Sequence, residues 1–280
     1  DKVMIQPPVY HPFAWVTTRN ERTLVINPLR WENGMYRMDL DAFREQIKGC
    51  KLFILCNPHN PGGVVWTEAE LRAIADICYD EKVLVFSDEI HADLTLPPHT
   101  HRPFATVSEK ARMNSVTFMS PSKAFNMPGL SASHALIFNE DLRKRFRIYM
   151  DAGELDMGHV FAFLSVEAAY SHGTEWLDQC LAYIQGNIDF VDDFLKNHAP
   201  KIKAIRPEAS YLVWLDCREL ELSQKDLNEF FVDKAHLALN DGEMFGKEGI
   251  GFMRLNVASP RCIIEKAMKQ LADAYQLYIK

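Results

Sequence analysis

The segment LFILCNPHNPGGVVWTEAELRAIADICYDEKVLVF, residues 52–86, contains the alternation that determines the fold class. Its two ends, Leu52–Cys56 and Val83–Phe86, are apolar runs without polar alternation, which is typical of strands buried on both faces. Between them, Thr67 and Glu70 form a capping-box pattern that predicts the start of a helix. The buried face of that helix is predicted by apolar residues at helical spacing, Leu71, Ile74, Ala75 and Cys78. This strand–helix–strand order indicates an α/β fold with a mostly parallel sheet.

The same alternation extends over the first half of the chain, and the second half differs. Further apolar runs predict strands at Val3–Ile5, Thr23–Ile26, Ser115–Met119 and Ala135–Phe138. The second half predicts a long helix over Gly173–Asn197, a strand at Tyr211–Leu215, a helical stretch at Ser223–Lys234, a strand at Phe252–Val257 and a closing helix from Arg261. We therefore expect a large domain over residues 1–172, and a connecting helix with a small α+β domain over residues 173–280.

Composition limits the classes of protein to which the chain can belong. It has 280 residues, a net charge of −7 and 48% hydrophobic residues, which excludes a disordered chain. The acidic balance and the lack of a long basic run argue against binding to nucleic acid or to a membrane. The six cysteines lack the spacing of a zinc or redox site, so we expect reduced thiols and a cytoplasmic protein.

Three polar segments follow directly after predicted buried strands, where ligands bind in open α/β sheets. They are Asn57–Gly63, Ser87–His91 and Ser120–Asn126. Each also has a simple structural interpretation, namely a rigid turn, a helix N-cap and a loop with a solvated lysine. A standard metal site is not predicted, because no ligand spacing matches among Asp88, Glu89, His91 and Asp93.

The charged residues near these segments have specific chemical requirements. A carboxylate such as Asp88 at the end of a buried strand needs a cationic partner. A partly desolvated lysine such as Lys123 becomes a nucleophile able to form Schiff bases. Arg254 lies inside an apolar run and requires a carboxylate or phosphate, or else a structural ion pair. His99 and His101 are interpreted as part of a polar loop near the mouth of the site, without an assigned role.

Taken in order, four motifs resemble those of a known enzyme superfamily. They are Asn-Pro-x-Asn-Pro-x-Gly at 57–63, Asp-x-x-His at 88–91, Ser-x-Ser-Lys at 120–123 and Arg-x-Asn at 254–256. This order resembles the fold-type I enzymes that use pyridoxal 5′-phosphate (PLP), in the class I/II aminotransferase superfamily. Within it, Asp88–His91, Ser122–Asn126 and Arg254–Asn256 with Pro260-Arg261 are similar to the MalY/PatB-type cystathionine β-lyases. The resemblance covers essentially the whole chain and implies an aspartate aminotransferase-like fold in which residues 1–172 bind PLP.

The resemblance implies the roles of the residues closest to the reaction. Lys123 carries PLP as an aldimine and, once displaced, removes the Cα proton of the amino-acid substrate. Asp88 pairs with the pyridine nitrogen and keeps it protonated, so that the ring withdraws electrons. Arg254 binds the substrate α-carboxylate and thereby fixes which Cα bond is broken.

The remaining implied residues bind the cofactor. Asn60 is expected to hydrogen-bond the 3′-oxygen of the ring, and Tyr10 to stack on the ring face. His91 stands where many aminotransferases of the superfamily have a tyrosine. Ser120 and Ser122 are expected to donate hydrogen bonds to the phosphate.

The resemblance favours one reaction over two alternatives. The arginine that usually binds phosphate after the lysine is absent from residues 126–133, as in the β-lyases. We therefore expect a C–S β-lyase that cleaves cystathionine or a related S-substituted L-cysteine to a thiol, pyruvate and ammonia. An aminotransferase of the same fold and a non-catalytic regulatory protein with a protein partner remain alternatives.

The start of the chain leads to two further expectations. Residues 1–6 already read as a core strand, whereas family members have a substantial section before it that completes the phosphate site. The sequence therefore predicts a missing N-terminal section and an incomplete phosphate site. Because the family's site is completed across a subunit boundary, the resemblance also implies a homodimer.

Overall fold

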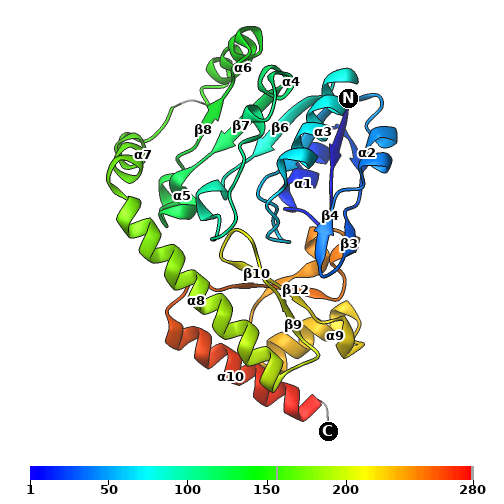
Figure 1. The fold of residues 1–280 in the computed structure, drawn as a ribbon, viewed down its shortest axis with the longest axis vertical. Coiled ribbons are helices and arrows are strands. Elements are labelled where there is room, and N and C mark those ends of the chain that lie inside the picture. Colours follow the sequence, from blue (N-terminus) through cyan, green and yellow to red (C-terminus); the bar gives the residue numbers. More distant parts are fainter. Residues whose placement is uncertain (156, 279–280) are drawn as a thin grey trace.

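The computed structural model describes residues 1–155 and 157–278 and contains a large sheet and a small sheet connected by a long helix (Figure 1). The large sheet has the strand order β2-β1-β5-β6-β7-β8. Its strands are β1 (Lys2–Ile5), β2 (Thr23–Ile26), β5 (Cys50–Cys56), β6 (Leu84–Asp88), β7 (Ser115–Met119) and β8 (His134–Leu136). Neighbouring strands are parallel except for β7 and β8. The predicted α/β fold is thus confirmed.

Helices lie between these strands in the chain, and two more follow β8. They are α1 (Pro12–Arg19), α2 (Leu40–Gln46), α3 (Glu68–Asp80), α4 (Glu109–Met113), α5 (Pro121–Ala124), α6 (Glu140–Ala152) and α7 (Val160–His172). The predicted capping box is present at the start of α3, where Thr67 and Glu70 bond each other's backbone. β6 extends two residues beyond the predicted run, so Asp88 is the last residue of the strand. The predicted strand at 135–138 is instead the shorter β8 at the edge of the sheet, where two residues are partly buried and Leu136 is exposed.

The small sheet follows α8 (Thr174–His198), the long helix in the lower left of Figure 1. Its strands have the antiparallel order β11-β12-β10-β9. They are β9 (Lys203–Ile205), β10 (Leu212–Asp216), β11 (Asn240–Asp241) and β12 (Phe252–Asn256), accompanied by α9 (Gln224–Glu229) and α10 (Arg261–Tyr278). The predicted helical stretch at 223–234 comprises α9 and a π-helical segment through Lys234. Apolar residues of α8 and α10 pack against β10 and β12 in one core.

A hairpin fixes the small sheet against the large one. The hairpin consists of β3 (Arg30–Glu32) and β4 (Met35–Arg37). Trp214 of β10 stacks on Phe252 at 5.2 Å and donates a hydrogen bond from its indole nitrogen to the hydroxyl of Tyr36 in β4, at 3.2 Å. This packing brings β12 to the turn after β5, where Arg254 of β12 donates a hydrogen bond to Asn60. None of the described helices combines the length and the apolar character needed to cross a membrane.

Candidate active site

The candidate site lies where the carboxyl ends of β5, β6 and β7 meet. Asn60 is in the turn after β5, Asp88 ends β6, and Lys123 is in α5 directly after β7. A cleft of about 220 Å³ opens at this edge and continues to the small sheet. Six of the predicted site residues line it, namely Tyr10, Asn60, Asp88, His91, Lys123 and Arg254. The topology therefore brings together residues separated by up to 244 positions, Tyr10 to Arg254.

Asp88 and Lys123 are the opposite charges at the base of the cleft. Burial raises the pKa of the Asp88 carboxyl from 3.8 to about 6, and the nearby Lys123 charge counteracts part of that rise. The Asp88 side chain accepts a hydrogen bond from the amide of Ile90 at 3.3 Å. Across residues 1–155 and 157–278, neither Asp88 nor Lys123 forms an ion pair. A desolvated carboxylate of this kind is stabilised by a cation entering the cleft.

Arg254 is an arginine held in the cleft by amides instead of a carboxylate. Its guanidinium donates to the side-chain oxygens of Asn60 at 2.9 Å and Asn240 at 2.7 Å. It lies over the ring of Phe245 at 4.6 Å, and its buried Nε has no hydrogen-bond partner among the described residues. Burial lowers the pKa of Arg254. Because arginine binds carboxylates through a planar fork, this environment fits an anionic ligand.

The position of Arg254 also orients Asn60. Since the Asn60 Oδ1 accepts from Arg254, its Nδ2 is the atom left to donate a hydrogen bond into the cleft. Asn60 is 7% exposed, so this donor is fixed by its surroundings and not free in solvent.

His91 is a neutral, buried imidazole in the wall of the cleft. Burial and the charges of Lys123 and Arg254 lower its pKa to about 3. Its Nδ1 has no hydrogen-bond partner within the described chain, and its ring lies 6.1 Å from that of Tyr211. A buried imidazole nitrogen without a partner is costly, so it too fits a polar group of a ligand.

Two predicted residues do not line this cleft. The hydroxyls of Ser120 and Ser122 both donate to the carbonyl oxygen of Ala132, at 2.5 and 3.2 Å. Ser120 also accepts from the amide of Ser122 and so caps α5. Because both donors are already engaged, their contact with a phosphate stays a prediction.

Three further polar residues of the cleft were given no role from the sequence, although Asn256 belongs to the Arg-x-Asn motif. Tyr211, Asn240 and Asn256 line the cleft beside Arg254. Asn256 lies two residues after Arg254 in β12, and alternation along a strand places both on one face. That spacing was a usable signal for Asn256. Nothing local marked Tyr211 or Asn240, because the packing of the small sheet brings them to the site.

A second, mostly apolar pocket of about 410 Å³ adjoins the cleft. The two share Lys123, Tyr211 and Asn256, and the second pocket is further lined by Trp176, Cys180 and other residues at the start of α8. The site therefore combines the Lys123 amine, the Asp88 carboxylate and the Arg254 guanidinium with adjoining apolar space.

Comparison with known proteins defines the class of protein to which this site belongs. The model of the family "Aminotransferase class I and II" matches residues 1–271, so the chain belongs to that family. Within it, the chain is 38% identical to cystathionine beta-lyase PatB of Bacillus subtilis, over 98% of this chain and 71% of PatB. It is 32% identical to protein MalY of Escherichia coli, over 97% of this chain and 70% of MalY.

Two solved structures have the same fold. Cystalysin from Treponema denticola, which contains PLP, matches with a TM-score of 0.95 and 34% identity, over all of this chain and 71% of cystalysin. The PLP-bound C–S lyase from Staphylococcus hominis matches with a TM-score of 0.90 and 33% identity, over 98% of this chain and 70% of that lyase. The resemblance inferred from the motifs is confirmed, both for the superfamily and for the MalY/PatB group.

Proposed function

We propose that this chain is a PLP-dependent C–S β-lyase that cleaves cystathionine or a related S-substituted L-cysteine. The single observation that carries the proposal is the convergence of Asp88, Lys123 and Arg254 on one cleft. Relatives named cystathionine beta-lyase support the reaction type. PLP-bound neighbouring structures support the cofactor.

The unsatisfied groups of the cleft match the chemical groups of PLP. The Asp88 carboxylate fits the protonated pyridine nitrogen, which supplies the cation that its buried position requires. The Asn60 Nδ2 fits the 3′-oxygen, Tyr10 fits the ring face, and the Lys123 amine is the group that holds the aldehyde carbon. When bound, PLP withdraws electrons from the Cα atom of an attached amino acid.

The protein residues supply the remaining steps. Arg254 binds the substrate α-carboxylate and fixes the orientation of the Cα–H bond. Lys123 accepts the Cα proton as the general base. Loss of the proton from Cα allows the Cβ–S bond to break, so that sulfur departs with the bonding electrons and is released as a thiol after protonation. Addition of water to the remaining three-carbon fragment yields pyruvate and ammonia. His91 is neutral, so it contacts the ligand without adding charge.

An assay with two readouts tests this function. Purified chain with PLP and L-cystathionine is expected to release thiol and pyruvate in equal amounts, and added α-keto acid is expected not to change the rate. An aminotransferase would instead require the α-keto acid and release no thiol. Exchange of amino groups without thiol release would therefore overturn the lyase proposal.

We further propose that residues 1–172 and 173–280 are the large and small domains of a cytoplasmic homodimer. The support for the dimer is α7, whose sequence is apolar on all sides although only Ala162 is buried. Phe161 and Phe163 are 61% and 62% exposed, and Tyr149 of the preceding helix α6 is 72% exposed. A helix that is apolar all round is stable only when covered. A second copy of the chain is the partner that we propose covers α7, because the family's site is completed across a subunit boundary.

Charge on α7 is expected to disrupt this dimer. The variant Phe161→Asp with Phe163→Asp should have half the wild-type mass in light scattering, because aspartate is costly to bury in an apolar interface. The control is Ile263→Asp on α10, where an apolar side chain is 54% exposed. A wild-type chain of 32.2 kDa in solution, or a double variant of unchanged mass, would contradict the proposed interface.

A further inference from the structure

Glu89 is a fully buried carboxylate that lies next to Asp88 in the chain but outside the cleft. Its side chain accepts three hydrogen bonds: from the Ser87 hydroxyl at 2.7 Å, the Phe104 amide at 2.8 Å and the His101 Nε2 at 2.7 Å. Glu89 is 1% exposed, and the His101 side chain is 9% exposed. His101, interpreted from the sequence as part of a polar loop near the mouth of the site without an assigned role, therefore pairs with a buried acid.

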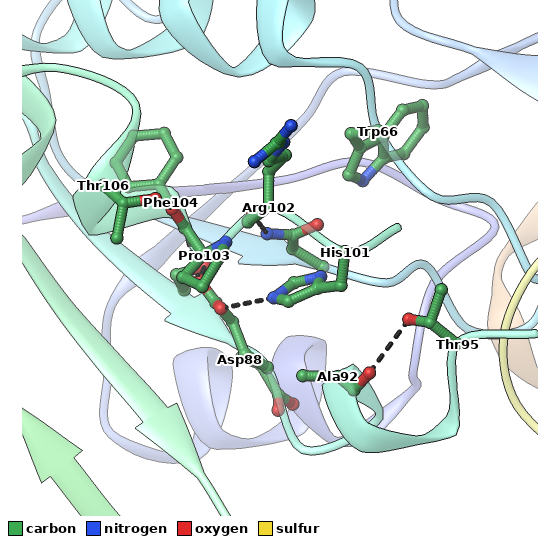
Figure 2. Close-up of polar contacts among 12 residues, drawn as sticks. Trp66, Asp88, Ala92, Thr95, His101, Arg102, Pro103, Phe104 and Thr106 are labelled. Carbon is green, nitrogen blue, oxygen red and sulfur yellow. Dashed lines mark hydrogen bonds and ion pairs between the residues drawn. The ribbon is translucent and has the colours of Figure 1, made fainter. Parts of the chain in front are cut away.

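Strand alternation explains why the two neighbouring carboxylates face different surroundings. Successive side chains at the end of β6 point to opposite faces, so Ser87 and Glu89 share one face and Asp88 takes the other. In Figure 2 the Asp88 carboxylate points away from the ring of His101. The Asp88 side chain therefore lines the cleft, while the Glu89 side chain bonds His101 on the opposite face of the strand.

The backbone around Asp88 is fixed from three directions. The Asp88 carbonyl accepts from the Asn57 amide at 2.9 Å, and the Glu89 amide donates to the Phe118 carbonyl at 2.8 Å. The third direction is the segment 101–104, attached through Glu89 itself and through the Asn57 side chain, which donates to the Arg102 carbonyl at 3.1 Å (Figure 2). Of these attachments, only the one through Glu89 and His101 uses ionisable side chains.

A buried carboxylate paired with a histidine is a more costly contact than is needed to attach a loop. Burying a carboxylate is costly unless several donors compensate it, and a neutral amide or hydroxyl would anchor the loop at less cost. The 2.7 Å separation between His101 Nε2 and Glu89 Oε2 is that of a charge-assisted hydrogen bond. In addition, the Glu89 charge acts on its neighbour and contributes to the raised pKa of Asp88.

We propose that the Glu89–His101 pair is a positioning device that holds Asp88 in line with the ring nitrogen of the bound cofactor. The inference rests on the proposed function, because it assigns Asp88 to that nitrogen. The pair locks the peptide between residues 88 and 89, so a rotation there cannot swing the Asp88 carboxylate out of the cleft. Glu89 and His101 are positioning residues and do not contact the cofactor themselves.

Paired variants of the full chain test this inference. Glu89→Gln keeps the shape and two hydrogen bonds but removes the charge, and His101→Leu removes the donor. Both are expected to raise the Kd for PLP about tenfold, the lower end of the cost of losing an outer-sphere partner. They are also expected to lower the visible circular dichroism per bound PLP, which reports the orientation of the cofactor. His101→Gln retains a donor of similar reach and should stay close to wild type.

A matched control separates positioning from stability. Asp192→Asn also removes a buried carboxylate, one paired with Lys196 at 2.8 Å on α8 and outside both pockets. This variant is expected to lower Tm while leaving PLP affinity and circular dichroism unchanged. If Glu89→Gln and His101→Leu behave in the same way, the pair is only an anchor for the loop and the inference is wrong. If Glu89→Gln does not fold, the comparison of His101→Leu with His101→Gln decides.

The experiment distinguishes a failure of this inference from a failure of the proposed function. A wild-type chain without a visible PLP band would refute the assignment of Asp88 and the cofactor together. A wild-type chain with a normal band, and variants indistinguishable from it, would refute only the role of Glu89 and His101.

Discussion

Lys123→Ala is expected to lower kcat/KM for thiol release by about 10³-fold or more, since positioned general bases contribute about 10²- to 10⁴-fold and Lys123 also holds the cofactor. The visible band of bound PLP should disappear with it, because among the residues that the structure describes no other lysine lines the cleft. Absorption spectra and a pyruvate assay on the same sample measure both effects.

Two controls separate the chemistry of Lys123 from its charge. Lys123→Arg keeps a positive charge beside Asp88 but supplies no nucleophilic amine at neutral pH, so it should be as inactive as the alanine variant. Lys110→Ala removes a partly exposed lysine, remote from the cleft, that pairs with Asp76 and Asp80, each at 3.1 Å, and should remain fully active. Substantial lyase activity in Lys123→Ala would show that the base is another residue.

The residues on the large sheet were predictable from local patterns alone. Apolar runs marked β5, β6 and β7, and parallel strands have their carboxyl ends at one edge of the sheet. Asp88 and Lys123 each follow such a run, so their proximity follows from the strand order. By contrast, Arg254 reaches Asn60 across 194 positions because Trp214 packs on Tyr36, a tertiary contact without a sequence pattern.

Two features of the structure, the β3–β4 hairpin and the burial of His101, were not predicted from the sequence, and each omission has a physical cause. The β3–β4 hairpin was not predicted, although its Asn33-Gly34 turn is the preferred pair for a tight hairpin, with positive φ at both residues. Its three-residue strands are too short to show alternation, so the turn was the only signal. The burial of His101 could not be predicted, because polar loop residues are usually exposed and its partner Glu89 is identified only by the packing.

Asp88→Asn is expected to have opposite effects on activity and on the stability of the cofactor-free protein. Asparagine cannot neutralise a protonated ring nitrogen, so kcat/KM should fall about 10²- to 10³-fold, the cost of removing one electrostatic contact at a reacting group. Without PLP, however, the same carboxylate is a desolvated charge that destabilises the fold. The variant should therefore unfold at a higher temperature than wild type at neutral pH.

The pH dependence of the Asp88 carboxyl determines whether Asp88→Asn raises or lowers the free energy of unfolding. Between pH 3.8 and about 6 the unfolded chain has released the Asp88 proton while the folded chain retains it. The contribution of Asp88 to the free energy of unfolding therefore falls as pH rises through this window, by up to about 3 kcal/mol, and is constant above it. Asp88→Asn lacks this loss, so its stability advantage should appear above pH 6 and vanish below pH 3.8.

Thermal unfolding of cofactor-free wild type and Asp88→Asn at pH 4 and pH 7.5 measures the difference, with Asp192→Asn as the control. Asp192 is buried but paired with Lys196 and Arg206, so its loss should destabilise the protein at pH 7.5. Addition of PLP should stabilise the wild type more than Asp88→Asn, because only the wild type offers the ring nitrogen a carboxylate. Equal stability of both proteins at pH 7.5 would mean that water or another cation already compensates Asp88. The Asp88 carboxylate thus destabilises the cofactor-free protein and becomes favourable only when a cation enters the cleft. Its presence is explained by ligand binding and not by the stability of the fold.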